Sequence, residues 1–517
     1  AIVFMVVAAA SPLTVVGGAA PLGFLLGNGV GFPTLFATSA VILVLFSVGL
    51  SAMAKHVAKP GAFFTYVGYG LGRSAGLAAA WVAMLTYTTV QIAVYGYIGY
   101  LLSYTVAAIG GPTIAWWAMS MLVIAAVGIL GYRHIDVSSK VLGMLLIAEV
   151  GIVVALIVAV IVTGGAQGLS AAPFEPANVL SGSPGVGLMF AMAAYIGFEA
   201  TAVFRDEARD PDNTIPKATY AAVIGVGVFY TLASWALVMA WGPDGVVDAA
   251  AEDPGSMMIR TMARYLGTFG EVAVNILMLT AMFACVLSFH NVLTRYQHSM
   301  AVAGVLPERL AGVHARHLSP HASSLVQTAT AGILTIVFAV CGLDPLLQVF
   351  TWFSGIATLA IALLMAVTSV AIIVYFARTK RDRRVWHTVI APVLGLLGLL
   401  GAAGLIAANF PMLVSDVDAE GNPAFGLTST LLLSLIVVAA VVGFVQAAWI
   451  RARRPAAYAK LTNADKKALD AMAYPRGVPA GIKRAKRVRM RQAKIQVGIG
   501  QTIAQLTLSF WKGLFSV

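Results

Sequence analysis

Long runs of apolar residues alternate with short polar segments along most of the chain. A run of about 20 apolar residues is long enough to cross a bilayer as an α-helix. We place twelve such spans near residues 2–30, 33–54, 74–107, 114–131, 138–163, 184–209, 216–241, 268–303, 323–343, 345–376, 386–410 and 425–450. The longest, at 74–107 and 268–303, are expected to tilt or to run past the bilayer. The pattern predicts an all-α integral membrane protein with 12 transmembrane helices.

The charges in the loops predict how these spans are oriented. Alternate loops carry Lys and Arg, whereas the opposite loops carry mainly acidic residues. The basic set comprises Lys55, Lys59, Arg73, Arg133, Lys140, Arg205, Arg209, Lys217, Arg295, Arg309, Arg316 and the segment Arg378 to Arg384. Lys and Arg concentrate in cytoplasmic loops, and an even number of spans brings both termini to one side. We therefore predict a multi-pass protein of the cell (plasma) membrane with both termini in the cytoplasm.

The composition supports a membrane protein, and the distribution of charge distinguishes a C-terminal tail from the rest of the chain. The chain is 60% hydrophobic and 10% charged, whereas soluble proteins carry roughly 25% charged residues. The net charge of +12 is uneven, because residues 451–517 hold fifteen basic and two acidic residues while residues 1–450 hold eighteen and nineteen. We predict a transporter-sized core at 1–450 and a basic cytoplasmic tail at 451–517.

The tail has two interpretations that the sequence leaves open. It joins a basic cluster, Lys483 to Lys494, to an apolar stretch from Ile495 to Phe515. A surface helix of this kind would bind anionic lipid, since each Lys or Arg contributes about 1 kcal/mol at such a surface. The alternative is a poorly ordered tail without a specific role. Nucleic acid is not an expected partner, because no recognisable binding module is present.

The first and sixth spans each contain a segment that disfavours a continuous helix. The first carries Gly17-Gly18-Ala19-Ala20-Pro21, in which Pro removes a backbone donor and Gly costs conformational entropy. The sixth carries Glu199 inside an apolar run, where an acid is costly and marks a functional-site hypothesis. Their spacing of five spans favours two inverted five-helix repeats, at about 1–163 and 184–376, with extra helices at 386–450. Helices 1 and 6 would be broken at mid-membrane; the alternative is that the glycines only allow close packing.

Such breaks suit a zwitterionic ligand. Unwound backbone leaves N–H groups free at one half-helix end and C=O groups free at the other. The N-terminal end, with its positive dipole, attracts a carboxylate, and the C-terminal carbonyls attract an ammonium group. A site between the two spans therefore needs no dedicated charged side chain.

Four blocks of sequence carry a family resemblance. The segment from Ile196 to Ala200, continuing through Arg209-Asp210-Pro211 to Ala218, resembles the sixth-span signature of the amino acid–polyamine–organocation (APC) transporters. Val16 to Leu22 lies where that family has its glycine-rich first-span motif. Lys59 to Arg73 resembles the entry to the third span, and Arg295 to Pro307 resembles the end of the eighth. The resemblance covers about residues 10–450 and excludes the tail.

The resemblance implies alternating access with the substrate held between spans one and six. Backbone at 17–19 would meet the substrate carboxylate, and backbone at 195–197 would meet its amino group. Phe198 would close over the site as a gate or serve only in packing, and Glu199 would brace the unwound segment or contact the amino group. The implied substrate-binding residues are Val16, Gly17, Gly18, Ala19, Tyr195, Ile196, Gly197, Phe198 and Glu199. Ala19 and Pro21 depart from the family's first-span pattern of two glycines around a small residue.

The residue expected to couple transport to an ion or a proton lies in the fifth span. Some sodium-independent family members carry a Lys there in place of the sodium ion, and the equivalent residue here is Glu149. We suggest Glu149 as a proton-coupling site or as the partner of a cationic substrate; the alternative is a protonated structural Glu bonded to a neighbouring helix. By span position alone, Tyr95, Tyr97, Ser288 and Trp352 are candidate liners of the site.

These features predict a secondary transporter for amino acids or related amines, proton-coupled or exchanging. The alternative is a membrane sensor or subunit that binds substrate without moving it. An enzyme is not expected, since no cluster of catalytic or metal-ligating residues appears, and we predict neither a cofactor nor a metal. The sequence leaves the substrate open between cationic and neutral amino acids and amines.

Overall fold

The computed structural model describes residues 11–57, 63–133, 139–198, 211–314, 319–455 and residue 458. Within these ranges the chain is nearly all helical, and its only extended pairing is an isolated bridge between Val417 and Pro423. Glu199 and most of the predicted basic tail lie outside the described residues.

Ten helical segments in the described part are long and apolar enough to cross a membrane. They are α4 (Phe32–Ala54), α6 (Arg73–Ala108), α7 (Trp116–Arg133), α8 (Ser139–Thr163), α12 (Pro211–Trp241), α14 (Met257–Val302), α15 (His321–Val340), η6 (Pro345–Phe350) with α16 (Thr351–Thr379), η7 (Trp386–Ile390) with α17 (Ala391–Ala408), and α19 (Leu427–Arg453). Most boundaries agree with the predicted spans to within a few residues. The largest difference is at α14, which begins at Met257 and is kinked at Gly267, where φ is 64°.

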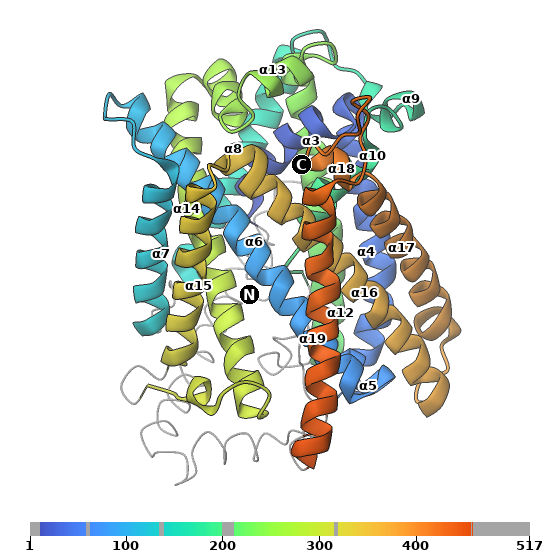
Figure 1. Ribbon diagram of the computed structural model, residues 1–517. Coiled ribbons are helices and arrows are strands. Elements are labelled where there is room, and N and C mark those ends of the chain that lie inside the picture. Colours follow the sequence, from blue (N-terminus) through green and yellow to red (C-terminus); the bar gives the residue numbers. More distant parts are fainter. Residues whose placement is uncertain are drawn as a thin grey trace.

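Short helices mark the two ends of the helical bundle. The segments α9 (Pro176–Val179), α13 (Val246–Glu252) and α18 (Phe410–Leu413) lie at one end, and α5 (Phe63–Leu71) lies at the other (Figure 1). We call these ends the α13 face and the α5 face. The described residues also include the short 3₁₀ helices η2 (Gly29–Gly31), η3 (Ala172–Phe174) and η5 (Glu308–Ala311).

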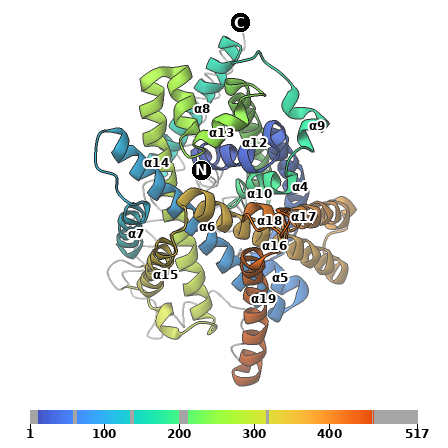
Figure 2. The same ribbon diagram turned by 45° about the horizontal axis from the view of Figure 1, so that its top comes forward.

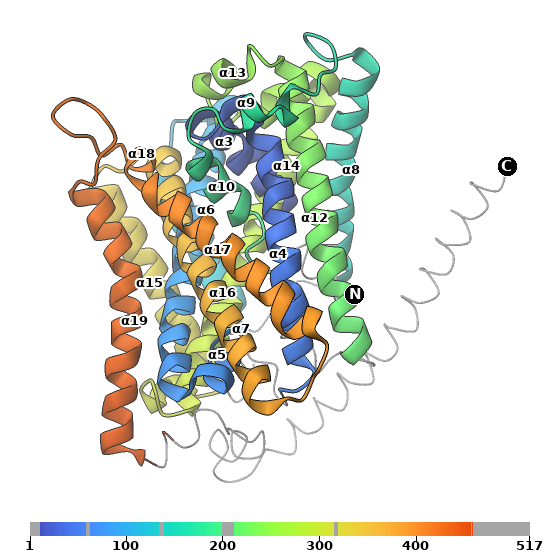
Figure 3. The ribbon, with the colours of Figure 1, turned by 90° about the vertical axis from the view of Figure 1, so that its right-hand side faces the viewer.

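The long helix α6 runs obliquely through the molecule and organises its packing (Figure 1). It contacts α14, α16 and α19, while α4 packs against α12 and α17. Viewed from the tilted and side directions, α8 and α19 lie on opposite sides of the bundle (Figures 2 and 3). The chain thus encloses its first span, in which every residue from Pro12 to Phe24 is buried.

The first span does not unwind at its glycines, contrary to the predicted break. Its helix runs on through α2 (Pro12–Thr14), the π-helical segment η1 (Val15–Ala19) and α3 (Ala20–Leu26). Ala19 and Ala20 keep right-handed helical angles, and the Ala20 N–H bonds to the carbonyl of Val15, five residues back. Pro21 is the second residue of α3, directly after the π-helical segment, and it cannot donate a backbone hydrogen bond to the preceding turn. The irregularity is therefore a widened turn rather than a gap.

The sixth span ends its helix close to where the sequence predicts. The helix α10 (Pro184–Ala193) is followed by a turn through Phe198, and Gly197 has a φ of 109°. This is backbone that residues with a Cβ rarely adopt. The helix therefore ends three residues before the segment where the break is predicted, and the residues after Phe198 lie outside the described part of the chain.

Candidate substrate and coupling site

The π-helical segment of the first span is tied to the third span by Tyr97. The Tyr97 hydroxyl donates to the carbonyl of Gly17 at 2.7 Å. In a regular α-helix that carbonyl would accept from residue 21, but Pro21 has no N–H. A phenol from another helix therefore supplies a donor for this carbonyl. The sequence placed Tyr97 near the site by span position, and only the structure identifies this partner.

Gly17 and Gly18 allow two large side chains to approach the first span closely. A Cβ on Gly17 would lie 2.4 Å from Cε of Met278, and a Cβ on Gly18 would lie 2.4 Å from Cε1 of Tyr97. Neither glycine adopts a positive φ, so close approach is the physical reason for glycine here. These glycines therefore do allow close helix packing, which is the alternative that the sequence left open. Val16 and Ala19 are buried on the same segment.

The sixth-span side of the site is a tight turn. The N–H groups of Tyr195, Ile196 and Phe198 donate to the carbonyls of Met192, Ala193 and Tyr195 at 3.1, 3.1 and 3.2 Å. Between Ile196 and Phe198, Gly197 has a φ of 109°. The C-terminal end of α10, with its negative dipole, is thereby held inside the bundle.

The side chains of this turn point into α4 and α12. The Tyr195 hydroxyl donates to the carbonyl of Phe36 at 2.8 Å, and its ring meets Tyr230 edge to face at 6.4 Å. The Phe198 ring is buried and lies edge to face with Phe46 at 6.3 Å. Phe198 is therefore packed against α4 in this conformation, and its gating role stays a prediction.

We expect replacement of Gly197 by Ala to destabilise the protein. An added Cβ at a φ of 109° is strained, at a cost of about 1–3 kcal/mol. Thermal unfolding of the purified protein measures the effect. Gly225→Ala is the control, since Gly225 lies within α12 and a Cβ there meets nothing within 4 Å; this change should be neutral or stabilising. Equal midpoints for the two variants would contradict the strain.

Glu149 reaches from the fifth span to the start of the first. Glu149 is 5% exposed, and its carboxylate lies within electrostatic reach of the backbone N–H of Leu13. The second oxygen, Oε2, has no hydrogen-bond partner among the described residues. Tyr230 and Cys285 lie within electrostatic range of this carboxylate. Glu149 therefore joins α8 to α2, with side chains of α12 and α14 close by.

Tyr230 is a site residue that the sequence did not single out. It lies near Glu149 on one side and meets the ring of Tyr195 on the other. A buried tyrosine in an apolar span gives no local signal of this kind, because its importance comes from residues distant in the chain. Tyr230 connects the coupling candidate to the sixth-span half of the site.

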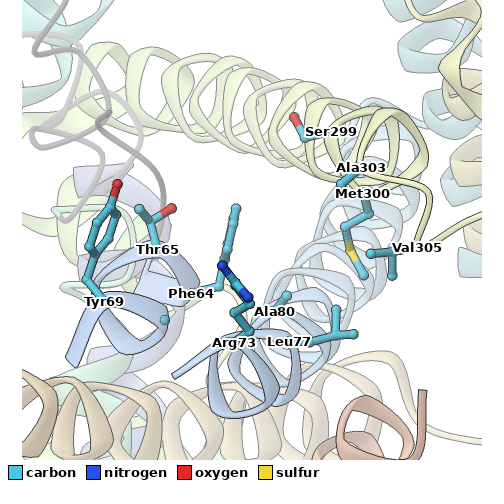
Figure 4. A pocket seen from close by; sticks show the side chains of 12 residues that line it. Phe64, Thr65, Tyr69, Arg73, Leu77, Ala80, Ser299, Met300, Ala303 and Val305 are labelled. Carbon is cyan, nitrogen blue, oxygen red and sulfur yellow. The ribbon is translucent and has the colours of Figure 1, made fainter. Parts of the chain in front are cut away.

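A separate cavity of about 60 Å³ lies at the α5 face (Figure 4). Phe64, Thr65 and Arg73 line it from α5 and α6, and Ser299 and Met300 line it from α14. Arg73 also lies 5.6 Å from the ring of Tyr458, at the start of the predicted tail. Of the predicted substrate-binding residues that the structure describes, none lines this cavity.

Comparison with known proteins decides the family. The model of the amino acid permease family matches residues 13–458. The chain belongs to the amino acid permease family. The permease is therefore a transporter and not an enzyme.

Individual relatives of the permease are distant. It is 22% identical over 408 residues to an uncharacterized transporter of Mycobacterium tuberculosis, covering 79% of this chain and 85% of the relative. It is 20% identical over 315 residues to a low-affinity putrescine importer of Escherichia coli, covering 59% and 67%. It is 24% identical over 331 residues to an L-asparagine permease of Escherichia coli, covering 60% and 64%. The second and third of these relatives are named for an amine and an amino acid.

Proposed function

We propose that the permease is a secondary active transporter that moves amino acids or related amines across the plasma membrane by alternating access. Protons are the proposed coupling ion, and both termini are proposed to lie in the cytoplasm. The observation that carries this proposal is the Glu149 carboxylate, which bridges the fifth span to the N-terminal end of α2.

The bridge provides a way for one proton to change the packing of a whole span. A charged carboxylate binds an N–H about twice as strongly as a neutral acceptor does. Adding a proton to Glu149 would therefore loosen its hold on Leu13 and on the first turn of α2. Oε2, unpartnered among the described residues, is the atom best suited to carry that proton. The competing role, a structural Glu that never changes its proton occupancy, predicts no dependence on a proton gradient.

The proposed substrate position lies between η1 and the turn at 194–198. The C-terminal end of α10 favours an ammonium group there. For a carboxylate to reach the N–H groups at 17–19, the π-helical turn must open and the side chains of Tyr97 and Met278 must move aside. Single π-helical turns are uncommon and often lie at functional sites. Tyr97 and Met278 lie against Gly17 and Gly18, and Phe350 packs on the Tyr97 ring. These aromatic and apolar side chains favour neutral amino acids as the first class to test.

Uptake by the purified permease in liposomes tests the proposal. We expect labelled neutral amino acids to enter by counterflow, and uptake to rise with an inward proton gradient. Protein-free liposomes are the control. Saturable substrate binding in a thermal-shift assay without uptake in either format would instead support the sensor alternative.

Recognition of the zwitterion gives a second expected result. An amino acid should compete for uptake at least tenfold better than the amine that lacks its carboxylate, because a hydrogen bond to a charged group contributes about 1.5–3 kcal/mol. Leucine and isoamylamine form a matched pair for the competition assay. Equal competition by the two would contradict recognition of the carboxylate, and would leave an amine transporter as the conclusion.

A further inference from the structure

The loop that joins α13 to α14 is folded around one carboxylate. In the segment Asp253-Pro254-Gly255-Ser256, Oδ1 of Asp253 accepts the N–H of Gly255 at 3.1 Å. Oδ2 accepts the hydroxyl of Ser256 at 2.5 Å. Arg260 on α14 donates to the Asp253 carbonyl at 3.1 Å, and forms an ion pair with Glu252 at the end of α13. The loop therefore has a fixed shape with the Asp253 carboxylate at its centre.

This carboxylate also docks the loop on the third span. The Tyr100 hydroxyl lies 2.8 Å from both oxygens of Asp253 and donates to them. The Tyr100 ring covers Gly255 so closely that a Cβ there would lie 2.3 Å from Cε1 of the ring. Glycine at 255 and a phenol at 100 are thus a matched pair, and Asp253 supplies the polar contact between them.

One helical turn before Tyr100, Tyr97 extends the connection to the first span. Its hydroxyl lies 2.7 Å from the Gly17 carbonyl and 3.2 Å from the Gly255 carbonyl. One hydroxyl proton serves two acceptors, so the first span and the loop share this donor. The same loop therefore contacts both tyrosines, and through Tyr97 it reaches the π-helical turn.

These contacts cover the candidate site from the α13 face. The helix α13 packs against α3, the second half of the first span, and both lie at that face (Figure 1). Met278 contacts Gly17 and is fully buried. A substrate that approaches η1 from the α13 face must first separate the loop from Tyr97 and Tyr100.

We propose that the loop at 253–256 is a gate at the α13 face and that Asp253 is its latch, because its carboxylate holds the loop on Tyr100. Tyr97 links this loop to the first span. Asp253 is a positioning residue: it holds the loop closed over the site and does not itself contact substrate. Opening exchanges the bonds of its carboxylate with the protein for bonds with water. The inference rests on the proposed transport function, but its test needs no known substrate.

A cysteine reporter tests the latch directly. Met278→Cys is placed in a protein whose Cys285 and Cys341 are replaced by Ala, and a membrane-impermeant thiol reagent is applied to vesicles of either orientation. Asp253→Asn replaces one acceptor oxygen by an NH₂ group, which donates and cannot accept a hydroxyl, and Tyr100→Phe has no hydroxyl to donate. Each change should raise the labelling rate from the α13 face about tenfold, in line with the loss of a hydrogen bond to a charged group. Labelling from the α5 face should stay the same or fall.

Asp248→Asn is the matched control, because Asp248 is an exposed acid on α13 itself. Its labelling rate should equal that of the parent. Size-exclusion profiles establish whether each variant is folded. If Asp253→Asn does not fold, Tyr100→Phe alone is used for the test. Folded latch variants that label no faster than the parent would overturn the proposal. Equal acceleration from both faces would also overturn it, since that indicates general loosening. Neither result depends on which substrate the permease carries.

Discussion

Glu149→Gln is expected to abolish the stimulation of uptake by an inward proton gradient while counterflow of the same substrate continues. Gln has nearly the shape of Glu and can still accept the Leu13 N–H through its amide oxygen. It cannot gain or lose a proton, so the strength of its contact with α2 no longer changes during transport. In proteoliposomes, uptake by the variant should be nearly flat between pH 5 and 8, on the order of tenfold below the parent under a gradient.

Glu271→Gln is the matched control for this result. Glu271 is an exposed acid on α14, and its replacement should leave both counterflow and the pH dependence unchanged. A Glu149→Gln variant that keeps the parental response to a proton gradient would remove Glu149 as the coupling residue. It would then remain a structural contact between the fifth and first spans.

Gly18→Ala is expected to destabilise the permease more than Gly17→Ala, although the two residues are adjacent. A Cβ at 18 would lie 2.4 Å from the ring of Tyr97, which is held by its hydrogen bond to Gly17. A Cβ at 17 meets the end of Met278, which has flexible torsions and can turn away. Overpacking against a fixed ring costs about 1–3 kcal/mol. Thermal unfolding in detergent should therefore place Gly18→Ala below Gly17→Ala, and Gly17→Ala close to the parent.

The double variant Gly18→Ala with Tyr97→Leu separates packing from substrate binding. If the ring is the cause, the double variant loses less stability than the sum of the two single variants. A Gly18→Ala protein of parental stability with a raised KM for uptake would contradict the packing explanation. It would show that Gly18 acts mainly on the substrate.

Some of these features were accessible from the sequence and some were not, and Gly197 and Gly17 illustrate the difference. The end of α10 was predictable, because Gly197 sits between an apolar helical run and a charged loop. The π-helical turn at 15–19 was not, since two glycines and a proline are compatible with either a gap or a widened helix. The donor from Tyr97 and the packing of Met278 both come from other spans.

For Glu149, one part of its role was predictable from the sequence and another part required the structure. Its depth in the fifth span follows from the apolar residues around it, and the sequence identified it as a coupling candidate. Its proximity to the Leu13 N–H, to Tyr230 and to Cys285 depends on how α8 packs against three other helices. In the same way, Asp253 was visible only as one acid among several in a loop, and its contact with Tyr100 required the fold.

The sequence by itself determined the membrane class, the positions of most spans and the family resemblance. These follow from the transfer of each apolar side chain from water to lipid, a free energy that depends on the residue and its near neighbours. The tertiary structure decided that the first span stays helical, that Glu149 holds its N-terminal end, and that Asp253 docks a loop on Tyr100. Each of these is a directional contact between segments far apart in the chain. Its energy exists only when packing brings a donor and an acceptor to within about 3 Å.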